Sequence, residues 1–210
     1  MIRLLIADDH PIVREGLIRI LTAHHGMTVA AEAADGDAVL QHVETTPLDA
    51  VLLDITMPGP GFVEVLRRLK QLRPRLPVLV LSIHPELPYA LRALRAGADG
   101  YLTKRQSPEQ LVQAIVKVSG GGKYVSGAVA EQLARRLRAD PGDAAHERLS
   151  NREFQVLCRL GMGKTVREVA VEMALSVRTV NTYRERIREK LELRTNAELV
   201  RYAVEHNLLN

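Results

Sequence analysis

Residues 49–61 read DAVLLDITMPGPG, and the interpretation of the whole fold starts from what this stretch forms. Residues 50–53 are apolar and mostly branched, which is typical of a strand buried on both faces of a parallel sheet. The next residue is Asp54, and the Met-Pro-Gly of residues 57–59 is typical of a loop. An acid at such a point is most often a turn residue or a helix cap. Because ligands of parallel sheets lie outside the carboxyl ends of the strands, Asp54 is also a candidate site residue.

Four more short apolar stretches have the same character and alternate with segments of helical period. They cover residues 3–7, 28–31, 78–81 and 100–102. Strands that alternate with helices predict an α/β fold, in which helices cover both faces of a doubly wound, five-stranded parallel sheet. A last helix from about Pro108 to Ser119 completes this first domain.

The second half of the chain predicts a different organisation. Three glycines follow the last helix, residues 126–138 form one amphipathic connecting helix, and residues 139–147 have the composition of a linker. Beyond the linker only helical patterns occur. We therefore expect a first domain over residues 1–118, a linker region over 119–147 and a small all-α domain over 148–210.

The composition excludes several classes of protein. The single cysteine, Cys158, can form neither an internal disulfide nor a thiolate zinc site. No apolar run approaches the ~18 residues of a membrane helix and the N-terminus does not resemble a signal peptide, so we expect a cytoplasmic protein with no membrane partner. Residues 1–118 carry 13 basic and 13 acidic side chains, whereas residues 147–210 carry 12 basic and 9 acidic ones. The basic excess at the C-terminal end is typical of a module that binds nucleic acid.

Polar side chains at the ends of the predicted strands indicate a site. Asp8 and Asp9 follow the first strand, and Asp54 ends the third. If these strands are neighbours, three carboxylates converge, and their repulsion raises at least one pKa unless a cation neutralises them. Oxygen ligands with room for water suit Mg²⁺. Ser82 and Lys104 follow the fourth and fifth strands, and the complete set suits phosphoryl transfer to a carboxylate, although each residue alone has an ordinary structural explanation.

Four separate motifs, LIADDHP, LLDITMPG, VLVLS and GADGYLTK, resemble the receiver domain of bacterial two-component response regulators over about residues 1–118. The resemblance implies a flavodoxin-like fold and a cognate sensor histidine kinase as phosphoryl donor. Asp54 would accept the phosphoryl group. Asp9, the Asp54 carboxylate and the backbone carbonyl of Thr56 would bind Mg²⁺, and Asp8 would contact the ion through water.

The same resemblance assigns the residues that respond to phosphorylation. Lys104 would pair with a phosphoryl oxygen, and Ser82 and Tyr101 would shift inward when that oxygen arrives. The sequence departs from the family in the loop that follows the phosphorylated acid. Receivers usually have a glycine eight residues after that acid, whereas here Phe62 occupies the position and the glycine is Gly61. The loop is therefore one residue short on the way into the third helix.

The C-terminal region contains three helix starts with capping patterns. Ser150 with Glu153, and Thr165 with Glu168, have the spacing of capping boxes, and a third helix starts at Ser176. The last two helices are separated only by MALS. This spacing predicts a helix-turn-helix.

The last of these three helices carries the candidate DNA contacts. We expect Val177, Val180, Ile187 and Leu191 to face the core. The opposite face and its flanks carry the side chains that would contact base edges and phosphates: Arg178, Thr179, Asn181, Thr182, Arg184, Glu185, Arg186 and Lys190. Without further information, charges opposite an apolar stripe are most often only a solvated face.

The motifs LSNREFQVL, GKTVREVA, LSVRTVNTYRERIREKLELR and NAELVRYAV resemble the LuxR-type DNA-binding domain over about residues 148–208. A receiver joined to this domain is the arrangement of the NarL/FixJ class of response regulators. The resemblance implies a transcription regulator, rather than an enzyme, that binds double-stranded promoter DNA, with a homodimer as its expected state. Asn181 and Tyr183 stand where lysine and histidine are frequent, so the DNA sequence that is read is expected to differ from that of other members.

Two other functions remain open from the residues. Asp54-Ile55-Thr56 after an apolar strand also resembles phosphatases of the haloacid-dehalogenase type, although those have the motif at their first strand and need no helix-turn-helix. A DNA binder that uses its receiver without phosphorylation is the second alternative. The GMGKT of residues 161–165 is not a P-loop, because Cys158 stands where glycine is needed and a helix precedes it.

Overall fold

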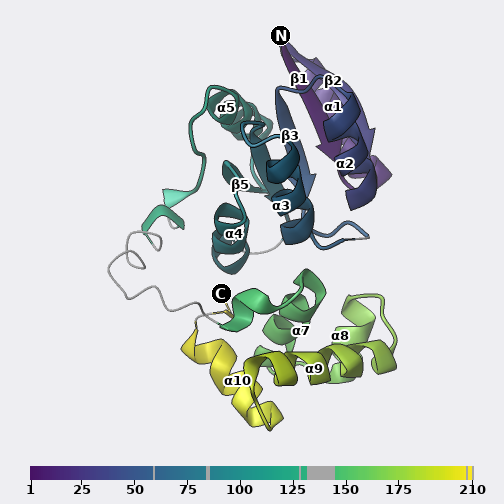
Figure 1. The fold of residues 1–210 in the computed structure, drawn as a ribbon, viewed down its shortest axis with the longest axis vertical. Coiled ribbons are helices and arrows are strands. Elements are labelled where there is room, and N and C mark those ends of the chain that lie inside the picture. Colours follow the sequence, from purple (N-terminus) through teal and green to yellow (C-terminus); the bar gives the residue numbers. More distant parts are fainter. Residues whose placement is uncertain (59, 84–85, 128, 132–144, 207, 210) are drawn as a thin grey trace. The chain divides into compact units, whose positions relative to one another are not determined.

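The computed structural model describes residues 1–210 except 59, 84–85, 128, 132–144, 207 and 210 (Figure 1). The chain divides into two compact units, Met1–Ala139 and Asp140–Asn210. Most of the predicted connecting helix and of the predicted linker lies outside the described residues. None of the described helices is long and apolar enough to cross a membrane.

The N-terminal unit contains the five strands that the sequence predicts, each within two residues of the expected ends. They are β1 (Ile2–Ala7), β2 (Met27–Ala33), β3 (Ala50–Asp54), β4 (Val78–Ser82) and β5 (Gly100–Thr103). All pairs are parallel and the spatial order is β2-β1-β3-β4-β5. Every residue of β3 and β4 is buried, as the apolar run at 50–53 predicts. The order reverses between β1 and β3, which puts the carboxyl ends of these two strands at the switch point of the sheet.

Helices cover both faces of this sheet (Figure 1). On one face, α1 (Pro11–Thr22) and α5 (Pro108–Ser119) bury residues such as Leu21 and Ile115 in a cluster with alternate strand residues, including Leu52. On the other face, α2 (Gly36–Thr45), α3 (Phe62–Leu72) and α4 (Glu86–Arg95) pack side by side in chain order. Because strand side chains alternate between faces, the sheet contributes to both cores. The predicted doubly wound, flavodoxin-like α/β fold is confirmed.

The shortened loop after β3 leads directly into a regular helix. Gly61 is the N-cap of α3, and Phe62 is its first residue and is buried. The loop lies against the start of α2, where the backbone N–H of Gly36 donates a hydrogen bond of 3.4 Å to the carbonyl of Pro58. A Cβ atom at Gly36 would lie only 2.6 Å from a methyl group of Val65 in α3. Glycine at the start of α2 therefore permits the close approach that the short loop requires.

The C-terminal unit is helical throughout its described elements. It consists of a 3₁₀ turn, η1 (Ala145–Arg148), followed by α7 (Asn151–Gly161), α8 (Val166–Glu172), α9 (Val177–Leu191) and α10 (Asn196–Glu205). Helix α7 packs against the other three helices and buries Phe154 and Leu157 among them. This arrangement confirms the predicted small all-α domain.

The capping patterns predicted from the sequence occur as expected. Full capping boxes begin α7 and α8, and the hydroxyl of Ser176 accepts a hydrogen bond from Thr179 N–H at the start of α9. A short turn between α8 and α9 includes Ala174 in the left-handed region, at φ 51°. The prediction that Val177 faces the core is wrong, since this first residue of α9 is 44% exposed. The buried stripe begins instead at Val180.

Candidate functional site

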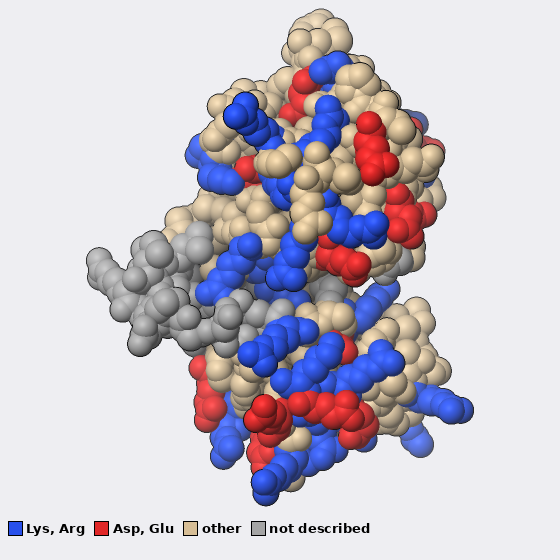
Figure 2. Space-filling view, viewed as in Figure 1, with Lys and Arg blue, Asp and Glu red and all other residues tan. Residues whose placement is uncertain are grey.

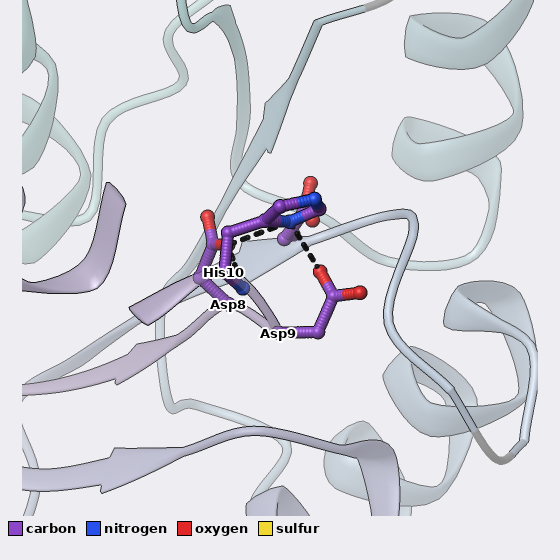
Figure 3. A group of neighbouring side chains, drawn as sticks. Asp8, Asp9 and His10 are labelled. Atoms are coloured by element: carbon purple, nitrogen blue, oxygen red, sulfur yellow. Dashed lines mark hydrogen bonds and ion pairs between the residues drawn. The ribbon is translucent and has the colours of Figure 1, made fainter. Parts of the chain in front are cut away.

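The carboxylates that end β1 and β3 lie together at the switch point. Ligand atoms of Asp8, Asp9, His10 and Asp54 all lie within 4.8 Å of one another. Asp8 and Asp54 are buried, whereas the Asp9 side chain is 28% exposed. The fold produces this cluster because β1 and β3 are adjacent and parallel, so that their carboxyl ends reach the same edge. Figure 3 shows Asp8, Asp9 and His10, which lie in the turn between β1 and α1.

Lys104 forms ion pairs with both buried acids. Its Nζ lies 2.6 Å from Asp8 Oδ2 and 3.1 Å from Asp54 Oδ1. The backbone N–H of Lys104 donates to the carbonyl of Ser82 at 2.7 Å, which fixes the start of the β5–α5 loop beside the end of β4. The ammonium group therefore bridges carboxylates from β1 and β3, and a metal ion would compete with it for the same oxygens.

Asp54 accepts local hydrogen bonds on both carboxylate oxygens. The Ile55 N–H donates to Oδ1 at 2.9 Å, and the hydroxyl of Thr56 donates to Oδ2 at 2.5 Å. Burial raises the pKa of Asp54 and the neighbouring Asp8 raises it further, whereas Lys104 and Thr56 act in the opposite direction. The sequence predicted a raised pKa from repulsion between the acids. The structure gives the same direction, but burial is the larger cause.

The two predicted switch residues lie on the two strands beyond β3, Ser82 on the adjacent β4 and Tyr101 on β5. Ser82 is buried and ends β4, directly after Leu81, which is the register partner of Asp54. Tyr101 in β5 is also buried, and its register partner is Val80. Both residues therefore belong to the strands that lead away from the acid cluster toward the far edge of the sheet.

Sequence reasoning missed three groups at this site. His10 lies with its ring beside Asp9, and Thr56 uses its hydroxyl in addition to the predicted carbonyl. Arg14 of α1 donates from Nη1 to the carbonyl of Asp8 at 2.7 Å and from Nε to Glu32 of β2 at 2.9 Å. The sequence did carry a signal for two of these groups, since DDHP places His10 directly after the acids and Arg14 follows one helical turn later.

The donor set fits Mg²⁺. Three carboxylates converge, and Asp9 Oδ1 accepts no hydrogen bond from the part of the chain that the structure describes. Hard oxygen ligands with one partly exposed side for water are those that Mg²⁺ prefers. Asp9, Asp54 and the backbone carbonyl of Thr56 are the residues that would hold the ion according to the prediction from the sequence.

The second candidate surface is the outer face of α9. Of its predicted DNA contacts, Arg178, Thr182, Glu185, Arg186 and Lys190 are exposed, and the remaining three are half-buried. Over the C-terminal unit, Figure 2 shows basic side chains interleaved with acidic ones rather than a uniformly basic face. This surface therefore presents separate positive and negative side chains, not one continuous basic patch.

Four of the charged side chains on α9 already have partners within the unit. Arg188 Nη1 lies 3.1 Å from Glu185 Oε2, and Arg184 Nη2 lies 3.4 Å from Glu185 Oε1. Lys190 Nζ lies 2.7 Å from Glu153 Oε2, and the Glu153 side chain is only 3% exposed. Lys190 was predicted to contact DNA phosphates, but its ammonium group anchors α9 to the start of α7.

Comparison with known proteins gives two family matches. A model of the response regulator receiver domain matches residues 4–116, and a model of bacterial regulatory proteins of the luxR family matches residues 147–203. Response regulator UvrY of Escherichia coli (strain K12) is 35% identical over 211 residues, covering 100% of this chain and 97% of that protein. Response regulator GacA of Pseudomonas aeruginosa is 37% identical, covering 100% and 99%.

A solved structure shows the same two-part arrangement. The response regulator RcsB of Salmonella typhimurium, studied for its conformational dynamism in DNA interaction, superposes with a TM-score of 0.58 at 26% identity. The match covers 97% of this chain and 98% of that one. The similarity therefore extends over both units of the chain.

Proposed function

Because the chain belongs to the DNA-binding response regulators of the NarL/FixJ class, which regulate transcription, we propose that phosphoryl transfer to Asp54 controls its binding to promoter DNA. A cognate sensor histidine kinase is the proposed donor. One observation carries the assignment. The Asp54 carboxylate is buried at the switch point of the sheet, within reach of a lysine, two further acids and a hydroxyl.

The proposed reaction needs a carboxylate oxygen of Asp54 as nucleophile. That oxygen forms a P–O bond as the P–N bond to the imidazole of the donor breaks. Bound Mg²⁺ would neutralise phosphoryl charge during the transfer. Lys104 holds a second positive charge at the same place, and its movement from Asp8 to a phosphoryl oxygen would keep that charge paired. Ile55 N–H fixes the orientation of the Asp54 carboxylate, because it donates to Oδ1 from the adjacent residue.

We propose that phosphorylation changes how α9 binds DNA. Ser82 and Tyr101 would report the phosphoryl group toward the far edge of the receiver, a role that their positions on the two strands beyond β3 support. Arg178, Asn181 and Thr182 lie in the first half of α9, where a recognition helix meets base edges in the major groove. A homodimer on a double-stranded promoter site, in the cytoplasm where sensor kinases expose their catalytic domains, completes the proposal.

The test is labelling followed by DNA binding. The full chain is incubated with acetyl phosphate and Mg²⁺, intact mass is measured, and operator binding is compared before and after. We expect one stable phosphoryl group per chain and altered DNA binding, and Asp54→Asn should lose both. Asp49→Asn is the matched control, because Asp49 precedes the same strand but lies outside the acid cluster.

Other outcomes of this experiment would overturn the proposal. Full labelling of Asp54→Asn would show that another group accepts the phosphoryl. Rapid release of phosphate from many esters would favour the phosphatase alternative. Labelling without any change in DNA binding would favour a regulator that works without phosphorylation.

A further inference from the structure

His10 occupies the N-cap of α1 but does not cap the helix. The N-cap is usually Ser, Thr, Asp or Asn, whose side chain accepts a hydrogen bond from the first turn. The His10 side chain makes no such bond, and Pro11 at the first helical position favours the helix start by its fixed φ. The imidazole is instead turned toward the acids at the end of β1 (Figure 3).

The ring nitrogen lies at ion-pair distance from Asp9, although the contact does not have the geometry of a hydrogen bond. His10 Nδ1 is 2.8 Å from Asp9 Oδ1 and 3.5 Å from Asp8 Oδ1. Asp9 Oδ1 is shielded from solvent, yet no described residue donates a hydrogen bond to it. Two ligands that each lie about 2.1 Å from one metal ion are about 3.0 Å apart at the right angles of octahedral coordination, and about 3.4 Å apart at tetrahedral angles. The separation of this nitrogen and oxygen is therefore close to that of two neighbouring ligands of an octahedral ion, and a tetrahedral ion requires a small movement of the exposed imidazole.

A nitrogen ligand changes which ions the site prefers. Mg²⁺ takes oxygen ligands and keeps its water, so an imidazole adds little to its binding. Imidazole suits borderline transition ions, whose affinity for mixed nitrogen and oxygen sites rises from Mn²⁺ through Co²⁺ to Cu²⁺, with Zn²⁺ below Cu²⁺. The His10 side chain is 65% exposed, so it can adjust to an ion without disturbing the core.

We propose that His10 is a nitrogen ligand at the phosphoacceptor site, so that the receiver binds a borderline transition ion such as Zn²⁺ or Co²⁺ more tightly than Mg²⁺. The carboxylates of Asp9 and Asp54 complete the ligand set. This inference rests on the proposed function only in that the ion would bind the same carboxylates, those of Asp9 and Asp54. Its consequence is regulatory, because a transition ion held there competes directly with Mg²⁺ for the oxygens that phosphoryl transfer requires.

The test measures ion binding by the full chain, not its phosphorylation. Zn²⁺ affinity is measured by competition with a chromophoric chelator, Mg²⁺ affinity by calorimetry, and the ligand type from the visible absorption of bound Co²⁺. We expect His10→Ala to lower the ratio of Zn²⁺ to Mg²⁺ affinity at least about tenfold and to shift the Co²⁺ bands. His24→Ala is the matched control, because His24 is an exposed histidine of the same unit at the far end of α1.

The result that overturns the inference is a Zn²⁺ to Mg²⁺ affinity ratio, or a Co²⁺ spectrum, that is the same in His10→Ala and in the unmodified chain. Asp9→Asn should weaken both ions, and retention of both affinities in that variant would also overturn it. Thermal unfolding of each variant shows that the fold is intact. The proposed function fails separately, through labelling of Asp54→Asn, and that failure would leave the ion affinities of His10→Ala unaffected.

Discussion

The acid cluster of the receiver and the outer face of α9 use charged side chains in opposite ways. In the cluster, Asp8 and Asp54 are buried, and Lys104 pairs with both. On α9, Arg178 and Arg186 are exposed, and the ion pairs there connect neighbours on the same helix. A buried charge is strongly destabilised when it loses its partner, so its ion pair persists. The ion pairs of exposed charges are weak, so these side chains can exchange their partners for a ligand at little cost in free energy.

Lys190 lies on the exposed face of α9, but its ion pair resembles those of the buried acid cluster. Its ammonium group lies 2.7 Å from Glu153, whose other hydrogen bonds begin α7. Removing Lys190 leaves that carboxylate buried without its counter-ion. A helix face that binds DNA can therefore contain a residue whose main contribution is to stability, and the following variants separate the two contributions.

The largest effect on stability is expected from Glu153→Ala. It removes the capping box of α7 and leaves Lys190 without its buried partner, so the free energy of unfolding of the C-terminal unit should fall by about 2–3 kcal/mol. Differential scanning calorimetry of the full chain measures this loss. Glu198→Ala is the matched control, because Glu198 completes the same capping box at α10 but is only half-buried and has no such buried ion pair. Equal losses in the two variants would show that the ion pair with Lys190 contributes nothing.

Asn181, Glu185 and Arg186, which have no buried ion pair, should affect DNA binding without affecting stability. Asn181→Ala and Glu185→Ala should change the preferred operator sequence, by about 1–3 kcal/mol for each lost base contact. Arg186→Ala should weaken binding to all sequences and reduce the salt slope by about 1. The main effect of Lys190→Ala should be a lower unfolding temperature, and its effect on the salt slope should be smaller than that of Arg186→Ala.

A randomised operator library, read at two salt concentrations, measures all four variants. The assignment of base contacts is wrong if Asn181→Ala and Glu185→Ala keep the preferred sequence. A loss of salt slope in Lys190→Ala equal to that in Arg186→Ala would mean that Lys190 leaves Glu153 for a phosphate.

The difference between the two regions also explains what the sequence could predict. A strand buried on both faces leaves an unbroken apolar run, so residues 50–53 and the acid that follows them identify the site directly. Helix caps are equally local, and those at Ser150, Thr165 and Ser176 were predicted correctly. The pairing of Lys190 with Glu153 joins residues 37 apart and depends on how α9 packs on α7. No periodicity within one helix contains that information.

The short loop and His10 were difficult to predict for a related reason. The loop is accommodated because Gly36 of α2 allows α3 to approach, and α2 is distant from the loop in the sequence. His10 was overlooked because a residue between a strand and a helix is normally explained as a cap. Its actual neighbour, Asp9, is adjacent in sequence, but only the conformation of the turn brings its nitrogen to the carboxylate oxygen.

Lys104→Ala tests whether the buried cation and a metal ion compete. Without the ammonium group on Asp8 and Asp54, we expect Mg²⁺ to bind about three to ten times more tightly, since one positive charge no longer opposes the ion. Phosphorylation of this variant should not change its DNA binding, because the cation that pairs with the phosphoryl oxygen is absent. Calorimetry measures the Mg²⁺ affinity, with Lys123→Ala, a largely exposed lysine of the same unit, as control. Weaker Mg²⁺ binding in Lys104→Ala would show that the lysine organises the acids rather than competing with the ion.

The smallest effect concerns an ion pair that is exposed on both sides. Arg3 holds the pKa of Asp49 at about 2, chiefly through a hydrogen bond between their side chains. Because this folded pKa lies below the unfolded value of about 3.9, the stabilisation is present above pH 4 and is lost as the pH falls toward 2. Solvent screens the pair, so Asp49→Asn should lower the melting temperature at pH 6 by only about 1–4 °C. The difference in melting temperature between the two chains should shrink steadily from pH 5 to pH 2.5. A difference that stays constant over this range would mean that Asp49 stabilises the start of β3 by its shape and by the hydrogen bonds that it accepts from Arg3, rather than by its charge. Solvent exposure would then not explain why this ion pair contributes less to stability than a buried one.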